Sequence, residues 1–581
     1  MVRLQSSLRF TLLALSLTIT CSGSIHAQGF LRAEGKRIVN EKGEKVLLRG
    51  IGLGGWMLQE GYMLRVPGEG QQHKIRAKIE ELIGAEKTAE FYTAWLANHT
   101  RKIDIDSMKA WGFNSVRLPM HYNLYTLPIE AEKSDESTWL DIGFAMTDSL
   151  LAWCKANQMY LILDLHAAPG GQGTDMNISD RDPNKPSLWD SEANQKKTVA
   201  LWRKLAERYV NEPWIGAYDV LNEPNWGFEN YDADKNGINE KKNEPLKKLL
   251  VDITQAIREV DKKHIIIIEG NGWGNNYNGM LPPWDKNMVL SYHKYWNYND
   301  ENSIKGMLES REKYYIPIWL GETGENSNVW FTQAIALLEK NNIGWAWWPL
   351  KKIGFNNPLE VKSNPGYDAI LSYWNEKGAK PSRESALKAL IEITDALKLE
   401  QNIFHKDVID AMMRQPHTST TIPFNPNTLH KSQTIPAVDY DLGRNGKAYF
   451  DKDSANYWVS NGPRGGNKGH TYRNDAVDIR RDSLSGKPII TDIEKGEWWQ
   501  YTIDVKDTGT YILNLDITPS IDTPVTVYLD GALVDDAKSK KQGSNSALQR
   551  TLKLQRGTHK LRVEAQRDGL QFKALELTRL R

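Results

Sequence analysis

Short apolar runs alternate with amphipathic stretches from about residue 30 to residue 390. The runs have the length of buried strands, whereas the intervening stretches, such as 198–209 and 246–260, carry apolar residues at helical spacing. Eight such runs occur, at 46–55, 113–119, 159–165, 215–221, 264–269, 288–293, 316–321 and 343–348. Strands that alternate with helices predict a parallel sheet, and eight of them favour a closed (β/α)8 TIM barrel. An open doubly wound sheet is the alternative.

The pattern changes after residue 400. Residues 401–434 combine helical spacing with a Pro- and Thr-rich stretch, which is typical of a linker. Beyond it, apolar and polar residues alternate in short runs, at 499–505, 511–516, 525–529, 552–554, 559–565 and 574–577. Such alternation predicts an antiparallel β-sandwich of jelly-roll type. We therefore predict an α/β barrel domain over 28–400, a helical and Pro-Thr-rich linker over 401–434 and an all-β sandwich over 435–581.

The first residues have the features of an export signal. A basic start is followed by an apolar run over 10–19 and by Ala27 at a site suited to cleavage. The apolar run is too short to span a membrane, so we expect residues 1–27 to be removed and no transmembrane segment to remain. The residues around Cys21 fit a lipoprotein poorly, so a secreted or periplasmic protein is favoured over an outer-membrane lipoprotein. Removal of the signal leaves Cys154 alone, so no intrachain disulfide is expected.

Composition narrows the class of partner. The formal net charge is +1, which argues against nucleic acid or an anionic membrane. The 21 Trp and 23 Tyr residues suit either a large aromatic core or surfaces on which sugar rings stack, and composition leaves both open. We expect a monomer without a cofactor.

Two of the predicted strands end on a glutamate. Glu223 closes the fourth run and Glu322 the seventh. In a barrel the C-terminal ends of the strands form the active site, and hydrolysis of a glycosidic bond requires two carboxyl groups. A lone glutamate at a strand end commonly caps the loop. The polar and aromatic residues at the other strand ends favour chemistry; they are Arg117, His166, Asn222, His293, Tyr295, Trp345 and Trp348.

The motifs resemble those of glycoside hydrolase family 5, in the same order along residues 30–375. The matching stretches are Arg117-Leu118-Pro119, Asp164-Leu165-His166, Leu221-Asn222-Glu223-Pro224, Tyr292-His293-Lys294-Tyr295, Leu320-Gly321-Glu322 and the Trp-rich eighth run. The resemblance implies a retaining (β/α)8 glycosidase with Glu223 as acid/base and Glu322 as nucleophile. It also implies that Asn222 holds the sugar 2-hydroxyl, within a subsite shaped by Arg117, His166, His293 and Tyr295.

Physical chemistry agrees with these roles. A retaining mechanism needs the two carboxyl groups about 5–5.5 Å apart, and strands four and seven lie across the barrel mouth from each other. We expect Glu322 to stay ionised, helped by a hydrogen bond from Tyr295 and by the charge of Arg117. Glu223 should keep its proton, because two close carboxylates repel and an apolar wall that includes Trp345 disfavours charge.

The stretches 52–60 and 166–172 resemble the exo-β-1,3-glucanase branch of the family. In that branch Glu60 would hydrogen-bond the glucose at the non-reducing end. His121 and the Asn-rich segment 225–243 depart from the branch, so exo and endo action both stay open. We expect a β-glucan substrate, either poly- or oligosaccharide, with an endo-acting cellulase or mannanase as the alternative. A non-catalytic glycan-binding protein is disfavoured because both glutamates are present, and transglycosylation would use the same residues.

A metal site is disfavoured. His166, His293 and the two glutamates could be drawn as ligands, but no His-x-His or His-x-x-x-His pair lies near them. Arg117 would also be a poor neighbour for a cation.

The C-terminal segment resembles carbohydrate-binding module family 6 around 472–479 and 496–501. The resemblance implies a sugar held by Tyr472 and an aromatic near Trp498, with Gln571 where that family has Asn. Pro436 and Val438 replace the acidic residues that bind a structural calcium, so no calcium is expected. Whether this domain binds sugar or only packs is left open. Trp498 and its neighbour alternate faces, so at least one is expected in the core.

Overall fold

The computed structural model describes residues 29–134, 137–519, 524–534 and 548–580. The export signal predicted for residues 1–27 lies outside these residues, so export stays a prediction from the sequence. Within the described part of the chain, none of the helices combines the length and the apolar character needed to cross a membrane.

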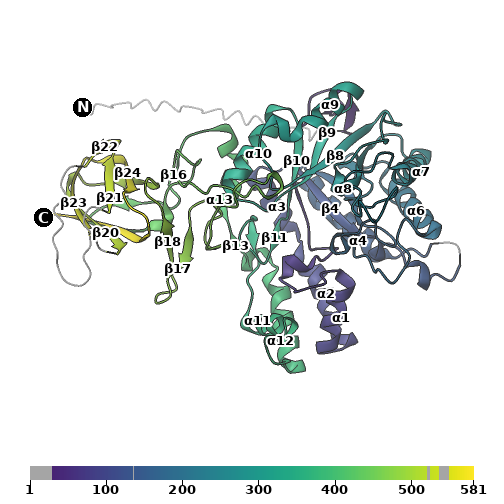
Figure 1. The fold of residues 1–581 in the computed structure, drawn as a ribbon, viewed down its shortest axis with the longest axis horizontal. Helices are drawn as coiled ribbons and strands as arrows, with labels where there is room; N and C mark the ends of the chain where they lie inside the picture. Colours follow the sequence, from purple (N-terminus) through teal and green to yellow (C-terminus); the bar gives the residue numbers. More distant parts are fainter. Residues whose placement is uncertain (1–28, 135–136, 520–523, 535–547, 581) are drawn as a thin grey trace, which may run out of the picture.

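Eight parallel strands close into a barrel within the described residues, in the order β10-β3-β4-β5-β6-β7-β8-β9 (Figure 1). They are β3 (Arg49–Gly52), β4 (Ser115–His121), β5 (Tyr160–Ala167), β6 (Ile215–Asp219), β7 (Ile265–Glu269), β8 (Met288–Lys294), β9 (Ile318–Gly324) and β10 (Gly344–Trp348). Each coincides with one of the eight apolar runs, so the predicted TIM barrel is confirmed. The runs are continuously apolar because nearly every residue of these strands is buried, between the barrel interior and the helices outside.

Amphipathic helices surround the barrel. They are α3 (Lys102–Trp111), α4 (Asp141–Ala156), α6 (Glu192–Tyr209), α7 (Glu244–Val260), α9 (Lys305–Tyr314) and α10 (Asn328–Lys340). Local signals set their starts: the Ser191 hydroxyl caps α6 by accepting from the Asn194 N–H, and Ser327 caps α10 in the same way through the Trp330 N–H. The short elements α5 (Met176–Ser179) and α8 (Asn271–Gly274) belong to loops at the barrel mouth.

A second helical layer lies below the barrel (Figure 1). It consists of α1 (Gln72–Ile83), α2 (Ala85–His99), α11 (Pro365–Trp374) and α12 (Arg383–Ala396), and it has an apolar cluster of its own. Two small sheets complete this half of the chain: β1 (Arg32–Glu34) with β2 (Arg37–Val39), and β11 (Lys351–Lys352) with β12 (Leu359–Glu360) and β13 (Ile403–Phe404).

The predicted linker over 401–434 is built into both domains. Its helix α13 (Lys406–Met413) contributes Val408, Ala411 and Met412 to the apolar core of the barrel. Further on, β14 (Thr428–Leu429) pairs with a strand of the C-terminal domain. The Pro- and Thr-rich composition therefore marks a change of domain but not a free tether.

The C-terminal domain consists of two facing sheets. One contains β14, β16 (Tyr449–Phe450), β19 (Trp498–Val505), β21 (Val525–Leu529), β22 (Ala532–Leu533) and β24 (Gly557–Ala565). The other contains β15 (Ser432–Pro436), β17 (Ile479–Arg481), β18 (Pro488–Ile493), β20 (Gly509–Thr518), β23 (Leu548–Leu554) and β25 (Leu570–Arg579). All pairings in these sheets are antiparallel except that of β14, as the alternation of apolar residues predicts. Trp499 and Phe572 meet in the core between the sheets.

Candidate active site

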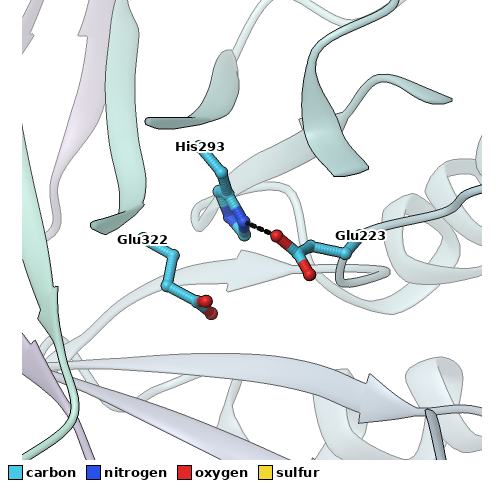
Figure 2. A group of neighbouring side chains, drawn as sticks. All are labelled: Glu223, His293 and Glu322. Atoms are coloured by element: carbon cyan, nitrogen blue, oxygen red, sulfur yellow. Dashed lines mark hydrogen bonds and ion pairs between the residues drawn. The ribbon is translucent and has the colours of Figure 1, made fainter. Parts of the chain in front are cut away.

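The two glutamates from strands four and seven of the barrel face each other at its mouth (Figure 2). Glu223 lies four residues beyond the end of β6, and Glu322 lies within β9. Three atoms lie within 4.8 Å of one another: one carboxylate oxygen of Glu223, one of Glu322 and a ring nitrogen of His293. Both side chains are buried, and each residue keeps 6% of its surface exposed. The pair is thus enclosed but open to the cavity described below.

Glu322 is held by two donors. Its Oε2 accepts from Arg117 Nη1 at 2.9 Å, and its Oε1 accepts from Tyr295 Oη at 2.8 Å. Burial raises the pKa of Tyr295, and the Glu322 charge raises it further, so the phenol stays protonated as a donor. These contacts fix the orientation of the Glu322 carboxyl group.

Glu223 has a different environment. Its Oε1 lies 2.6 Å from His293 Nδ1, and its backbone φ of 43° is unusual for a non-glycine residue. Burial raises the pKa of the Glu223 carboxyl, and the Glu322 charge adds to this, although His293 opposes it. Burial would lower the pKa of His293, but the carboxylates of Glu269 and Glu223 raise it well above its ordinary value. Burial therefore favours the protonated form of Glu223, as a general acid requires.

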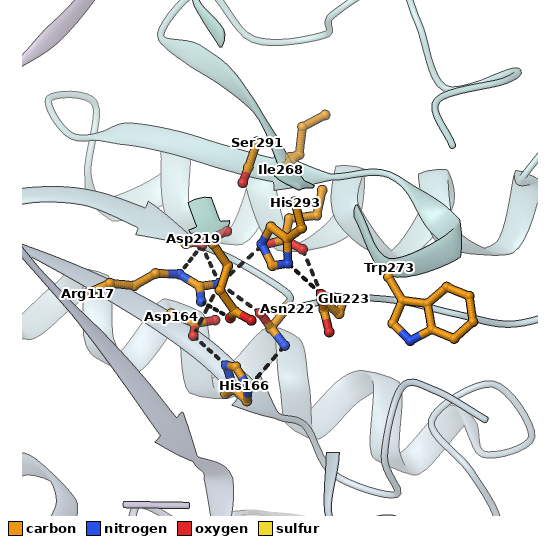
Figure 3. Close-up of polar contacts among 12 residues, drawn as sticks. Arg117, Asp164, His166, Asp219, Asn222, Glu223, Ile268, Trp273, Ser291 and His293 are labelled. Carbon is orange, nitrogen blue, oxygen red and sulfur yellow. Dashed lines mark hydrogen bonds and ion pairs between the residues drawn. The ribbon is translucent and has the colours of Figure 1, made fainter. Parts of the chain in front are cut away.

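Acidic side chains surround the Arg117 guanidinium, among them Asp164 and Asp219 (Figure 3). The Arg117 guanidinium contacts the carboxylates of Asp164, Asp219 and Glu269 at 3.3, 2.9 and 3.2 Å. Glu269 also accepts from the Glu223 backbone N–H at 2.8 Å and lies 3.1 Å from His293 Nε2. Sequence reasoning did not assign roles to Asp219 and Glu269. The signal was present, because Glu269 ends its apolar run just as Glu322 ends another.

Asn222 and His166 complete the floor of the site. Asn222 Oδ1 accepts from Arg117 Nη2 at 2.8 Å, and its Nδ2 lies 3.3 Å from His166 Nε2. His166 Nδ1 bonds Asp164 at 2.8 Å. Glu60 Oε1 lies 3.9 Å from His166 Nε2, and burial, followed by the Glu322 charge, raises the Glu60 pKa well above its ordinary value. The predicted residues of the strand ends thus form one connected network.

The two tryptophans predicted on the last strand behave differently. The Trp348 ring stacks on His166 at 5.1 Å and lines the cavity, as expected. Trp345 instead faces the helices that surround the barrel, where its indole N–H donates to Glu339 of α10 at 3.2 Å. The expectation that Trp345 contacts substrate or Glu223 is therefore corrected. Side chains alternate along a strand, and three positions separate Trp345 from Trp348 on β10, so the two rings face opposite sides.

A cavity of about 1410 Å³ opens above the two glutamates. Besides the predicted residues, its walls include Tyr62, Trp273, Trp296, Glu325 and, from the C-terminal domain, Val459. These residues lie on loops, where the sequence carries no periodic signal. Ligand pockets commonly measure about 300–1,000 Å³, so this one has room for more than one sugar ring.

Among the residues that the structure describes, Glu223, His293 and Glu322 form the one group spaced to hold a metal ion. Their chemistry fits a cation poorly. The Arg117 guanidinium already pairs with Glu322, and His293 is drawn toward its charged form by two carboxylates. A divalent ion would have to displace or repel both positive groups.

The residues predicted to bind sugar in the C-terminal domain do not form one site. Trp498 and Gln571 lie on different sheets, each next to a residue that points into the core, Trp499 and Phe572. They therefore point outward on opposite faces, and Arg562 covers the Trp498 ring at 4.2 Å. Tyr472 is half-buried and bonds Asp439. The resemblance to carbohydrate-binding module family 6 stays a prediction from the sequence.

Residues 77–353 match the family described as Cellulase (glycosyl hydrolase family 5). A beta-xylosidase from Phanerodontia chrysosporium is 26% identical over 430 residues, which cover 66% of this chain and 85% of that protein. Endoglucanase C from Acetivibrio thermocellus is 26% identical over 314 residues, 43% and 84% of the two chains. A probable glucan 1,3-beta-glucosidase A from Aspergillus clavatus is 24% identical over 298 residues, 50% and 64% of the two chains. Among solved structures, an endoglucanase from Thermotoga maritima is 19% identical with a TM-score of 0.36, covering 50% and 90%.

Proposed function

We propose, from the match of residues 77–353 to the cellulase family, glycosyl hydrolase family 5, that the protein is a retaining glycoside hydrolase that acts on β-glucans. The observation that carries the proposal is the spacing of the two glutamates, whose carboxylate oxygens approach within 4.8 Å. Retaining glycosidases hold their carboxyl groups about 5–5.5 Å apart, whereas inverting ones need about 6.5–9.5 Å to admit a water molecule. The observed spacing favours direct attack by a carboxylate.

The first step assigns one role to each glutamate. Glu322 attacks the anomeric carbon, the glycosidic C–O bond breaks, and Glu223 gives its proton to the departing oxygen. The sugar is then joined to Glu322 as an ester. Arg117 and Tyr295 hold the Glu322 carboxylate in position for this attack, since both donate to it in the resting site.

The second step reverses these roles. Glu223, now ionised, takes a proton from water, the water oxygen attacks the anomeric carbon, and the bond to Glu322 breaks. The proximity of His293 to Glu223 supports this change, because a positively charged imidazole stabilises the ionised acid between the two steps. The sugar leaves with its original configuration.

The preferred substrate in this proposal is a β-1,3-glucan attacked from its non-reducing end. A relative named as a probable glucan 1,3-beta-glucosidase and the placement of Glu60 beside His166 support it. Product analysis on β-1,3-, β-1,4- and β-1,6-glucans, mannan and xylan tests the choice. Glucose alone from a β-1,3-glucan supports exo attack, oligosaccharides from a β-1,4-glucan indicate an endo-acting cellulase, and cleavage confined to mannan or xylan rejects a glucan substrate.

Azide rescue tests the two roles. With an activated aryl β-glycoside, Glu223→Ala should accept azide in place of water and yield the β-glycosyl azide. Glu322→Ala should yield the α-glycosyl azide, because azide replaces the missing nucleophile. The matched control is Glu325→Ala, because Glu325 is a glutamate that lines the same cavity. This variant should form neither glycosyl azide. The opposite stereochemistry in the first two variants would exchange the roles, and no azide product in either would reject the mechanism.

A further inference from the structure

A loop of the C-terminal domain reaches the wall of the catalytic cavity. The domain lies beside α10 of the barrel (Figure 1), and its residues 456–464 form the loop, which contains the short turn η8 (Trp458–Ser460). Val459 of this turn lines the same cavity as Glu223 and Glu322. Its side chain is accessible from the cavity, since the residue is 63% exposed. The cavity wall is therefore shared between the two domains.

The loop contacts the segment that follows β8. The Val459 N–H donates to the Trp296 carbonyl at 3.0 Å, and the Ser460 hydroxyl accepts from the Tyr298 N–H at 3.0 Å. The Trp458 ring meets the Trp296 ring edge to face at 5.7 Å. The Tyr457 and Tyr298 rings stack at 4.7 Å. Trp296, a residue of the barrel that lines the cavity, is thus held by backbone and ring contacts from the other domain.

The loop is also fixed to the strand that carries Glu322. Asn326, four residues beyond Glu322, accepts from the Asn456 N–H at 3.0 Å and donates to the Asn456 carbonyl at 2.8 Å. The Trp296 indole N–H donates to the Glu325 carbonyl at 3.0 Å. The loop, the indole of Trp296 and the end of β9 therefore form one unit.

A buried polar network keeps the domains together. Asn328 Nδ2 donates to Asp407 at 2.8 Å and to Asp475 at 3.1 Å, and the Asn474 N–H donates to Asp407 at 2.7 Å. All four residues are almost fully buried. Separation of the domains would break these bonds, so the network favours one fixed arrangement.

Backbone strain gathers on the same wall. Trp296 has a φ of 50°, and Glu223, Trp273 and Glu325 have φ values of 43°, 57° and 53°. All four residues line the cavity. A bulky residue with positive φ is an outlier that persists where its surroundings hold it, and such residues cluster at ligand sites. For Trp296 the surroundings include the loop of the C-terminal domain.

We propose that loop 456–464 completes an outer sugar-binding subsite of the catalytic cavity. In this subsite the Trp296 ring packs against a sugar unit of a β-linked glucan that lies farther out than the two sugar units on either side of the scissile bond. Val459 borders this subsite, and Trp458 acts as a positioning residue for Trp296. The proposal rests on the proposed function for its ligand. An indole presents an apolar face that suits the C–H face of a pyranose ring, and the volume of the cavity leaves room for such a ring. The C-terminal domain is then part of the substrate site and not a separate anchor.

The experiment compares gluco-oligosaccharides of increasing length as substrates for the full chain. Val459→Asp places a charge in the subsite, and Trp458→Ala removes the brace of Trp296. In both variants KM for the longest oligosaccharide should rise about tenfold, whereas kcat should change little and the effect should shrink as the substrate shortens. Leu484→Ala is the matched control, since Leu484 is a 95% exposed apolar residue of the same domain. It should leave every constant at the wild-type value.

Each outcome bears on the proposal. If KM depends on oligosaccharide length in both variants as it does in the wild type, the proposal is overturned. An equal loss of activity at every length, together with a lower Tm, also overturns it, because it indicates a purely structural contact. If the wild type cleaves none of the oligosaccharides, the proposed function fails, and binding of the same oligosaccharides is then followed by tryptophan fluorescence. Length-dependent binding that weakens in Trp458→Ala upholds the subsite, and absence of binding overturns it.

Discussion

Tyr295→Phe tests how the site activates its nucleophile. The substitution removes only the hydroxyl that donates to Glu322 Oε1 at 2.8 Å. In the proposed mechanism the bond is charge-assisted, since its acceptor is the attacking carboxylate. Arg117 still holds the other oxygen, so Glu322 loses one of its two anchors and keeps the other.

The size of the effect follows from the type of bond. A hydrogen bond to a charged group contributes about 1.5–3 kcal/mol, and each 1.36 kcal/mol changes a rate tenfold. If the bond orients the attacking carboxylate, kcat/KM should fall by roughly 10- to 150-fold. The phenyl ring retains the packing of the tyrosine, so the free energy of unfolding should change far less than the activation free energy.

The assay measures kcat/KM on an aryl β-glucoside, because that constant reports the first chemical step. Tyr373→Phe is the matched control: its hydroxyl also donates to a glutamate, Glu81 at 3.0 Å, but on the exposed surface of the second helical layer. It should leave kcat/KM unchanged. A Tyr295→Phe enzyme within twofold of wild type, or one whose loss matches its loss of folded protein, would refute the reasoning.

Three further predictions follow from charges in the described residues. Burial and the neighbouring Glu497 raise the pKa of Asp451 to about 9, whereas an unfolded Asp titrates near 3.9. Between these two pH values the folded state binds more protons than the unfolded state, so the free energy of unfolding falls as pH rises. Between pH 5 and 8 the unfolding free energy in urea should therefore fall by about 1.4 kcal/mol per pH unit more in the wild type than in Asp451→Asn, and equal slopes would contradict the assignment. The raised pKa of Glu223 keeps the acid protonated to higher pH, so kcat/KM should decline on the alkaline side in the wild type. Glu223→Gln, assayed on a substrate with a good leaving group, should lose that decline. If the decline persists in the variant, a group other than Glu223 causes it. Lys351 and Asp104 form a fully buried pair at 2.7 Å, so Lys351→Met should destabilise the barrel by about 3–5 kcal/mol in urea unfolding. Lys351→Met with Asp104→Asn removes both charges and keeps an acceptor for the Arg101 N–H that caps α3. The double variant should recover much of the loss, and failure to recover would contradict the assignment of the loss to an unpaired buried charge.

The barrel was predictable because strand and helix periodicity record burial, which local sequence carries. The rim residues were predictable for a related reason: once the strands are parallel, their ends meet whatever the loops do. Glu223, Glu322, Arg117 and Tyr295 therefore come together as the strand ends indicate. These inferences need only the order of elements along the chain.

The remaining features divide in two. Trp345 was misplaced although alternation along β10 would have placed it, since three positions separate it from Trp348 and the two rings therefore face opposite sides of the strand. Trp498 and Gln571 were grouped although their inward neighbours send them to opposite faces. Val459 gave no signal, because its place on the cavity wall depends on how two domains pack.

Two of the carboxyl groups around Arg117, those of Asp219 and Glu269, differ in how readily they hold a proton. Asp164, Asp219, Glu269 and Glu322 all lie within 3.3 Å of the Arg117 guanidinium, and Arg117 together with the neighbouring His293 carries fewer positive charges than four ionised carboxylates would carry negative ones. Burial, with the charge of Glu269 next, raises the Asp219 pKa well above its ordinary value, whereas His293 and Arg117 outweigh burial and lower the pKa of Glu269. The Asp219 carboxyl at the base of the site therefore favours its protonated form. Nearer the mouth, Arg117 and Tyr295 hold the two oxygens of Glu322 by hydrogen bonds and so present the proposed nucleophile.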